Sequence, residues 1–377
     1  MKTSEMPVLE LRGTPIERGR VYGETMRSVI APLVESWRSH LGNFLHGTDE
    51  SSCTEADQYL HEFFQRTQYK SAITKWAPDL LEEVKGLAEG ANQSKENMLG
   101  MQLMDEEWVF GLRRSLDRPT TKCTAFGLPN QREGISYAGQ NMDIGSWIEG
   151  GQVLLHILAS NDGPESLVFT IAGEIGLNGL NSDGLGITCN TLPQLNYATD
   201  GLPVAFIVRK VLQHRDIDSA EQFLRSIKHA SGQNYILSTA GDVRCFECCG
   251  TSVTRYQPNL GQGRVFHSNH PLASDDITNI LPPEKMRSKN SVARFDSISS
   301  RLNNTSQLYS LEDIKAALSA HDDPENPVSR NINNENSPIG YTAGSSIYEF
   351  SNKPKLHLAS GPPCETQYKV FEFKSHQ

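Results

Sequence analysis

The pattern of apolar residues changes near residue 122, and this change limits the fold more than any other feature of the chain. Residues 24–116 carry many apolar side chains at the three- and four-residue spacing of amphipathic helices. After Cys123 the apolar residues fall into short runs bounded by glycine, proline and polar residues, as in β-strands. Helices grouped together, followed by grouped strands, predict an α+β protein built of packed layers rather than a doubly wound parallel sheet.

The first third of the chain is predicted to be mainly helical. Residues 8–23 read as a short strand and then a helix, with Pro15 in its first turn, where proline costs no hydrogen bond. Another helix starts near Pro78, because apolar residues 80, 81, 84, 87, 88 and 91 fall on one face. Residues 113–121 are polar and contain Pro119, which predicts an exposed linker.

Beyond Cys123, helices are predicted to interrupt a series of strands. Two helices are expected over 204–214 and 220–230, the second with Asp218 as its N-cap. A third begins at Ser310, which pairs with Asp313 in a capping box. The predicted strands cover residues 135–141, 152–159, 166–172, 185–190, 235–240, 243–248, 252–256, 344–350, 356–359 and 367–373.

Charge and cysteine usage argue against several classes of function. The 377 residues carry a net charge of −10 at pH 7 and no basic run, whereas nucleic-acid binding needs clustered cations. No apolar run approaches the about 18 residues of a membrane span, and the N-terminus lacks the apolar region of a secretory signal. Seven scattered cysteines are typical of free thiols in a reducing compartment. We therefore expect a cytoplasmic protein without nucleic-acid or membrane partners.

Cys123 lies where the two patterns meet, with small and polar neighbours in Thr-Lys-Cys-Thr-Ala-Phe. A cut just before it would give one residue both a thiol nucleophile and an α-amino group. An α-amino group has a pKa of about 8, so it can act as the base. Asp143 ends the run Gly-Gln-Asn-Met-Asp, where a hairpin return would bring its carboxylate beside the new amine. These residues predict an N-terminal nucleophile.

Such a nucleophile also needs donors for a developing oxyanion. Asn190 and Asn269 each stand at the predicted end of a strand, where an amide can donate to that oxygen. Arg294 offers a planar fork of donors that can orient the nucleophile or bind a carboxylate. His267 and His270 flank Asn269 at a spacing seen in metal sites, but no third ligand is in view. We therefore expect no metal and no cofactor.

Several longer motifs accompany these residues, and their order and spacing are more specific than any one of them. They are Leu11-Arg-Gly-x5-Gly-x3-Gly, Pro78-Asp-Leu-Leu-Glu-Glu-Val-Lys-Gly-Leu-Ala-Glu-Gly, Cys123-Thr-Ala-Phe, Gly139-Gln-Asn-Met-Asp, Gly176-Leu-Asn-Gly-Leu-Asn-Ser-Asp-Gly-Leu-Gly, His267-Ser-Asn-His-Pro and Gly361-Pro-Pro-Cys-Glu. Over nearly its whole length the chain resembles the acyl-coenzyme A:6-aminopenicillanic acid acyltransferase family of autoproteolytic N-terminal-nucleophile hydrolases, which includes β-alanyl-dopamine hydrolase.

The resemblance implies an αββα sandwich, with two antiparallel sheets between helical layers. It implies that the chain cuts itself between Lys122 and Cys123. Residues 1–122 and 123–377 would then be a small and a large subunit, a heterodimer of fragments packed as one domain. The family's catalytic roles fall on Cys123 as nucleophile, Asp143 as amine-orienting aspartate, Asn190 and Asn269 as oxyanion asparagines, and Arg294 as active-site arginine.

The leading hypothesis is hydrolysis of a small N-acyl amine or amide through a Cys123 thioester. An acyltransferase that passes the acyl group to an amine such as a β-lactam nucleus is the first alternative, because water and amines can both resolve a thioester. Lys122, where known relatives have glycine, favours a second alternative, an uncleaved and non-catalytic binding relative. A third is an uncleaved cysteine protease that uses His267 or His270 as its base.

The expected partner is a small-molecule amide or acyl substrate. Phe126, Tyr137 and Trp147, the last in the 144–150 loop, are the predicted substrate-binding residues. The sequence leaves a homodimer open.

Overall fold

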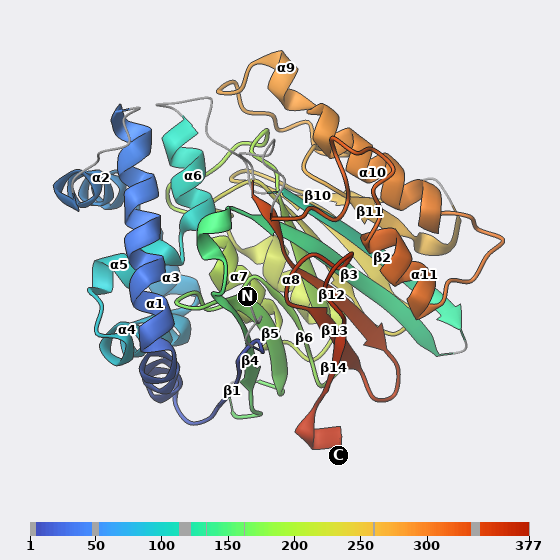
Figure 1. The fold of residues 1–377 in the computed structure, drawn as a ribbon, viewed down its shortest axis with the longest axis horizontal. Helices are drawn as coiled ribbons and strands as arrows, with labels where there is room; N and C mark the ends of the chain where they lie inside the picture. The colour runs from blue at the N-terminus through green and yellow to red at the C-terminus, as the bar shows by residue number, and fades with distance from the viewer. Residues whose placement is uncertain are drawn as a thin grey trace.

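The structure is a computed structural model, and it describes residues 5–46, 53–112, 122–132, 134–161, 163–258, 261–332 and 340–376. Two sheets pack face to face in the middle of the molecule (Figure 1). The eight-stranded sheet has the order β1 (Val8–Leu11), β4 (Gln152–Ile157), β5 (Ser166–Ile171), β6 (Asn178–Asn181), β7 (Gly186–Thr191), β8 (Gln233–Ser238), β9 (Val243–Cys248) and β10 (Val253–Tyr256). The six-stranded sheet has the order β11 (Val265–His267), β2 (Lys122–Arg132), β3 (Ile135–Ile144), β12 (Tyr341–Phe350), β13 (Lys355–Ala359) and β14 (Lys369–Glu372).

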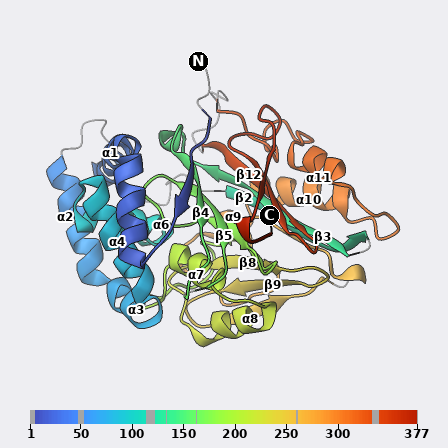
Figure 2. The ribbon, with the colours of Figure 1, turned by 90° about the horizontal axis from the view of Figure 1, so that it is seen from below.

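Helices cover the outer face of each sheet (Figure 2). α7 (Val204–Val211) and α8 (Ile217–Ser226) lie on the eight-stranded sheet, and α10 (Lys289–Leu302) and α11 (Leu311–Leu318) lie on the six-stranded sheet. α9 (Pro283–Met286) precedes α10. The predicted αββα sandwich is confirmed. The ladders are antiparallel except at one edge, where β1 runs parallel to β4, so the prediction of wholly antiparallel sheets is wrong there.

The N-terminal helices form a group of their own beside the sandwich (Figure 1). They are α1 (Pro15–His46), α2 (Cys53–Arg66), α3 (Tyr69–Trp76), α4 (Pro78–Ala91), α5 (Lys95–Met101) and α6 (Met104–Leu112). Glycines allow α1 and α4 to approach closely, because a Cβ at Gly19 would overlap the carbonyl oxygen of Glu83 and one at Gly86 would overlap that of Ile16. This packing explains why glycines recur in the two sequence motifs that begin at Leu11 and at Pro78.

Most predicted elements are present with shifted ends. The helix predicted over 220–230 is α8, and it starts earlier than predicted. Asp216 is its N-cap and accepts a hydrogen bond from the Ser219 N–H, so Asp218 lies in the first turn. The Ser310–Asp313 capping box is confirmed. The predicted linker 113–121 lies outside the described residues. Among those that are described, no helix is both long and apolar enough to cross a bilayer.

Strand β2 positions Cys123, the predicted nucleophile, between the sheets. Successive side chains of a strand point to opposite faces, so Cys123, Ala125 and Gly127 share one face. Ala125 packs with Ile236 and Cys245 of the opposite sheet, which shows that this face is the inner one. The neighbouring residues of β2 point outward, toward α10 and α11. Chemistry at Cys123 therefore lies at the end of the sandwich core.

Candidate active site

The β2–β3 hairpin brings the predicted nucleophile and aspartate together. Cys123 pairs with Met142, and Lys122 pairs with Asp143. The predicted hairpin is confirmed, since Asp143 lies directly across the β2–β3 ladder from Lys122. The Asp143 carboxylate is buried and accepts a hydrogen bond of 2.7 Å from the Thr342 hydroxyl of β12. The neighbouring strand thus fixes the orientation of this carboxylate.

Arg294 comes from α10 and holds the main chain of Cys123, the predicted nucleophile. Its guanidinium is fully buried and donates to the Cys123 carbonyl oxygen, and at 2.9 Å to the Thr124 hydroxyl. A second arm donates to Asn269 Oδ1 at 2.9 Å, and Nε donates to Asn290 at 2.9 Å. Burial lowers the pKa of Arg294 to about 10, which leaves it protonated at pH 7.

Asn269 presents its carbonyl oxygen to the nucleophile. The Cys123 N–H donates to Asn269 Oδ1 at 2.8 Å, while Asn269 Nδ2 donates to the Thr191 carbonyl oxygen at 2.9 Å. These partners fix the amide orientation, because Arg294 and Cys123 both supply donors and only Oδ1 can accept. The amide therefore faces Cys123 as an acceptor, whereas its predicted oxyanion role requires a donor. This geometry suits a group that positions the Cys123 nitrogen.

The Cys123 thiol is held in its protonated form. Burial raises its pKa, the carboxylates of Asp143 and Asp105 raise it further, and Arg294 opposes them. A thiol in this environment does not ionise on its own at neutral pH. Attack by its sulfur therefore needs a base close by.

Asn190 lies near the end of β7, and its side chain is buried. Its Oδ1 accepts from Asn234 Nδ2 at 2.8 Å, and its buried Nδ2 has no hydrogen-bond partner within the described part of the chain. The next residue, Thr191, contacts Asn269, which places Asn190 one residue from the network around Cys123. Its assignment to the oxyanion site remains a prediction.

The two histidines near Asn269 have other partners. His267 places Nε2 2.9 Å from the Glu247 carboxylate and Nδ1 2.8 Å from the Ser268 carbonyl oxygen. His270 Nδ1 lies 2.8 Å from the Ser291 hydroxyl oxygen, and burial lowers the pKa of His270 to about 4. In the described ranges neither ring hydrogen-bonds the thiol, so a conventional Cys–His pair gains no support.

The predicted substrate-binding residues Phe126 and Tyr137 lie on the opposite face of the β2–β3 hairpin from Cys123. Phe126 and Tyr137 are buried in a cluster with Ile298 of α10 and Ile314 of α11. They point outward from the hairpin, whereas Cys123 points inward, so their placement gives no support to the prediction that they contact substrate. Trp147 follows β3 in a 3-10 turn and packs near His40 of α1, with ring centroids 5.9 Å apart. Its predicted role stays untested.

Sequence reasoning missed Asp105, which continues the network from Cys123. Thr191 Oγ1 donates to Asp105 Oδ2 at 3.2 Å, and Gln233 Nε2 donates to the same oxygen at 3.0 Å. Asp105 opens α6 together with Glu106 and Glu107, inside an otherwise apolar helix. Consecutive acidic residues that a helix buries were the signal in the sequence.

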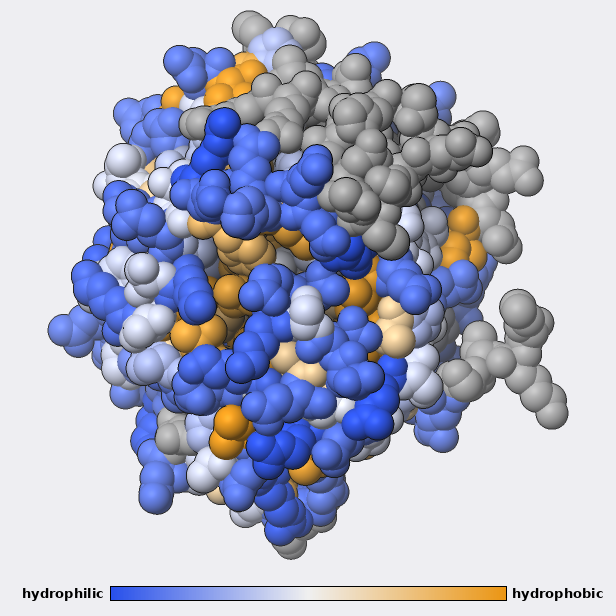
Figure 3. Space-filling model, turned by 90° about the vertical axis from the view of Figure 1, so that its left-hand side faces the viewer, coloured by the Kyte–Doolittle hydropathy of each residue, from blue (hydrophilic) through white to orange (hydrophobic). Residues whose placement is uncertain are grey.

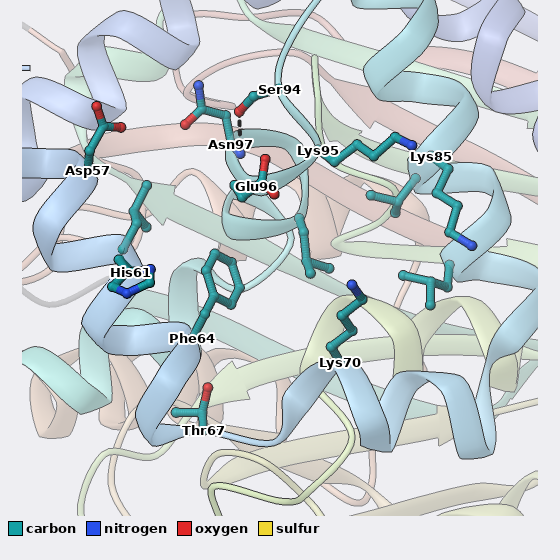
Figure 4. A pocket seen from close by; sticks show the side chains of 14 residues that line it. Asp57, His61, Phe64, Thr67, Lys70, Lys85, Ser94, Lys95, Glu96 and Asn97 are labelled. Carbon is teal, nitrogen blue, oxygen red and sulfur yellow. Dashed lines mark hydrogen bonds between the residues drawn. The ribbon is translucent and has the colours of Figure 1, made fainter.

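A separate cavity of about 630 Å³ lies among the N-terminal helices. Leu60, Phe64 and Leu81 are among its apolar lining, and Lys70 and Lys95 are among the polar residues around them (Figure 4). On this side of the molecule apolar side chains show in hollows between charged ones (Figure 3). None of the predicted site residues lines this cavity, so it is not part of the Cys123 site.

Comparison with known structures returns two proteins of low similarity. A variant of the conjugated bile acid hydrolase from Clostridium perfringens has a TM-score of 0.45 and 13% identity, covering 67% of this chain and 97% of that one. The N-acylethanolamine-hydrolyzing acid amidase ortholog of Caenorhabditis elegans has a TM-score of 0.42 and 12% identity, covering 60% of this chain and 92% of that one.

Comparison of sequences is more informative. The acyl-coenzyme A:6-aminopenicillanic-acid-acyltransferase 40 kDa form of Emericella nidulans is 26% identical over 263 residues, covering 69% of this chain and 68% of that relative. The sequence model of the acyl-coenzyme A:6-aminopenicillanic acid acyl-transferase family matches residues 130–361, more than half of the chain. The prediction of an enzyme acting on carbon–nitrogen amide bonds is confirmed at the level of this family. The chain therefore belongs to the acyl-coenzyme A:6-aminopenicillanic acid acyl-transferase family.

Proposed function

We propose that this protein is a cysteine N-terminal-nucleophile hydrolase that cuts itself between Lys122 and Cys123 and then cleaves a small N-acyl amine or amide. The observation that carries the proposal is the pair of side-chain hydrogen bonds to the Cys123 main chain. Asn269 accepts from its N–H, and Arg294 donates to its carbonyl oxygen. These contacts would hold the new amino group in place after the cut, beside its own thiol.

The proposed reaction uses that amino group as its base. The raised pKa of the Cys123 thiol means that the proton must be removed during attack, and the α-amine of the same residue accepts it. The sulfur bonds to the substrate carbonyl carbon, and the amine then gives the proton to the leaving nitrogen as the carbon–nitrogen bond breaks. Water hydrolyses the thioester. Asn269 and Asp143 position the amine, and Asn190 Nδ2 donates to the oxyanion.

The two proposed fragments, 1–122 and 123–377, would remain one domain after the cut. β1 belongs to the first fragment and pairs with β4 of the second. Both fragments also contribute to one apolar core, in which Ile30 and Leu87 of the first accompany Ile187 of the second. Burial of apolar area on this scale resists separation.

The cut is tested by intact mass and N-terminal sequencing of wild type, Cys123→Ala and Cys123→Ser. Wild type should give two chains, one beginning Cys-Thr-Ala-Phe, and Cys123→Ala a single chain of 41.8 kDa. Cys123→Ser keeps a hydroxyl nucleophile and should cut more slowly. Uncleaved wild type that still turns over an amide would contradict self-activation, and uncleaved, inert wild type would support the binding-protein alternative.

Acyl transfer is the second candidate, because the Emericella nidulans relative is an acyltransferase by name. The two outcomes compete for one thioester, so added amines should divert acyl groups from water. The ratio of new amide to free acid, measured at increasing amine concentration, separates a hydrolase from a transferase. A ratio that stays near zero at saturating amine identifies a hydrolase.

A further inference from the structure

The cavity among the N-terminal helices is large enough to hold a ligand of its own. Its lining comes from α2, α3, α4, the start of α5 and the turns between them. Its volume of about 630 Å³ lies within the range of small-molecule sites, roughly 300–1,000 Å³. Among the described residues that line it, none belongs to the network around Cys123. A ligand in this cavity would therefore occupy a second site.

The inner side of the cavity is apolar. Leu60, Leu81, Val84 and Leu99 line it, and each of them is almost fully buried. Phe64 lines it as well and packs against the main core, but its ring stays partly exposed. These side chains come from α2, α4 and α5, so an alkyl chain between the helices would contact apolar surface on more than one side.

The helices behind the cavity are packed without slack. A Cβ at Gly100 of α5 would lie 2.6 Å from the Trp37 ring of α1 and 3.5 Å from Leu60 of α2. Three helices thus meet at a position that only glycine can fill. The hollow beside this contact is therefore formed before any ligand binds, which spares the ligand the cost of ordering the site.

Lysines gather at one side of the cavity. Lys70 of α3 and Lys95 of α5 line it and are exposed, and within the described residues neither forms an ion pair. Lys85 of α4 also lines it, but its ammonium group pairs with Glu82. Figure 4 shows the three lysines on the side of the cavity opposite Asp57. The cavity therefore has an apolar interior and a cationic side.

The charged side chains of the lining leave one positive charge over. The three lysines face two acidic residues, Asp57 and Glu96. Asp57 is already paired with Arg38 at 2.8 Å, so Lys70, Lys95 and Glu96 set the balance. An excess of one charge matches a monoanion better than a doubly charged phosphate.

We propose that this cavity binds a single-chain aliphatic carboxylate, with its chain against the apolar side chains and its carboxylate on the lysine side. Each CH2 group that leaves water should raise the affinity about fourfold. The exposed lysines add a smaller contribution, because solvent screens their charge. The proposed hydrolysis would release such a carboxylate from an aliphatic amide, but binding at this second site does not depend on that function.

Isothermal titration calorimetry of the wild-type protein tests the two ends of the ligand separately. Octanoate carries both the chain and the charge, octan-1-ol keeps the chain alone, and butanoate keeps the charge on a short chain. Octanoate should bind at one site, about 100-fold more tightly than butanoate and about fivefold more tightly than octan-1-ol. Equal affinities for octanoate and butanoate, or for octanoate and octan-1-ol, would overturn the inference.

Variants locate the binding in this cavity. The double variant Lys70→Gln, Lys95→Gln should lower the affinity for octanoate about fivefold and leave that for octan-1-ol unchanged. Phe64→Ala should weaken both ligands about 10-fold, since it removes apolar surface that both contact. Lys75→Gln is the matched control, because Lys75 is exposed on α3 but lies over the Trp76 ring, 4.3 Å from its centroid, and outside the cavity lining.

Failure of this inference is distinguishable from failure of the proposed hydrolase. The titrations are repeated with Cys123→Ala, which cannot form a thioester, and the affinity for octanoate should not change. An affinity that persists in the lysine double variant and in Phe64→Ala would place octanoate elsewhere and contradict the assignment. The lysines are exposed, so the double variant should fold normally even where Phe64→Ala loses stability. Self-cleavage and amide turnover are separate measurements, and their absence would leave this result standing.

Discussion

Two groups of buried carboxyls lie close together in this molecule and have opposite surroundings. Glu83 of α4 accepts from Arg209 at 2.7 and 3.0 Å and forms a 3.1 Å ion pair with Arg18, so two cations enclose one anion. Glu106 and Glu174, by contrast, each leave an oxygen without a donor in the described part of the chain. A closed network of charges stabilises the packing of helices, whereas buried carboxyl oxygens without a donor cost stability.

The comparison shows why burial alone does not identify a functional residue. Glu83, Glu106 and Glu174 are all almost inaccessible to solvent. Only the charge balance distinguishes them: the partners of Glu83 come from α1 and α7, which it fastens to α4. The following predictions test this distinction.

The largest expected effect is on stability, at the closed network. Glu83→Ala would leave Arg18 and Arg209 buried without their partner and should lower the free energy of unfolding by about 3–5 kcal/mol. Glu89→Ala is the control on the same helix, since its ion pair with Arg20 is exposed and should contribute less than about 1 kcal/mol. Urea denaturation measures both. Equal losses of unfolding free energy in Glu83→Ala and Glu89→Ala would contradict a larger stabilising role for the buried ion pairs of Glu83.

Arg294→Lys should reduce catalysis about 100-fold and slow self-cleavage. A lysine cannot reach the Cys123 carbonyl, Thr124 and Asn269 together as the guanidinium fork does. Steady-state kinetics and the time course of fragment appearance measure the effect. Arg301→Lys, on the exposed side of the same helix, should behave as wild type. Normal self-cleavage and turnover in Arg294→Lys would show that the Arg294 guanidinium has a structural role only.

Asn190→Ala should lower kcat about 10- to 100-fold and leave KM nearly unchanged. Its free Nδ2 is the donor assigned to the oxyanion, which gains charge only in the transition state. Pre-steady-state acylation kinetics would locate the loss in the chemical step. A rise in KM at constant kcat would instead make Asn190 a substrate-binding residue.

Per pH unit, the smallest expected effect is a change in how stability depends on pH. Burial, followed by the charge of Asp105, raises the pKa of Glu106 to about 8 from an ordinary 4.5. The folded state therefore keeps a proton that the unfolded chain releases, so this residue makes stability fall as pH rises from about 4.5 to about 8. Glu106→Gln should reduce that slope, by at most about 1.4 kcal/mol per pH unit. Denaturation at pH 5, 6, 7 and 8 measures it, and an unchanged slope would contradict a raised pKa.

Local patterns in the sequence were sufficient to predict much of the candidate site. The switch to strands at Cys123 and the Gly-Gln-Asn-Met-Asp run predicted a hairpin, and the ladder places Asp143 opposite Lys122. Phe126 and Tyr137 point away from Cys123 for a reason that is itself local. Residues 123 and 126 stand on opposite faces of a strand, and the register of the hairpin puts Tyr137 on the Phe126 side.

Long-range contacts decided the rest. Arg294 was predicted as a fork of donors, but only the packing of α10 on β2 directs it to the Cys123 carbonyl oxygen. The orientation of Asn269 depends on Thr191, Arg294 and Cys123, which come from three other segments. No periodicity in one segment encodes such a set of partners.

The sequence by itself determined the α+β layers, the place of Cys123 at the start of the strands and the hairpin behind it, because side-chain periodicity and turn residues act over a few neighbours. Only the tertiary structure decided which buried charges are balanced. Glu83 and Glu106 look alike in sequence, each beside another glutamate in a helix. Their difference arises from the segments that fold against them, since the free energy of a buried charge depends on its neighbours in space.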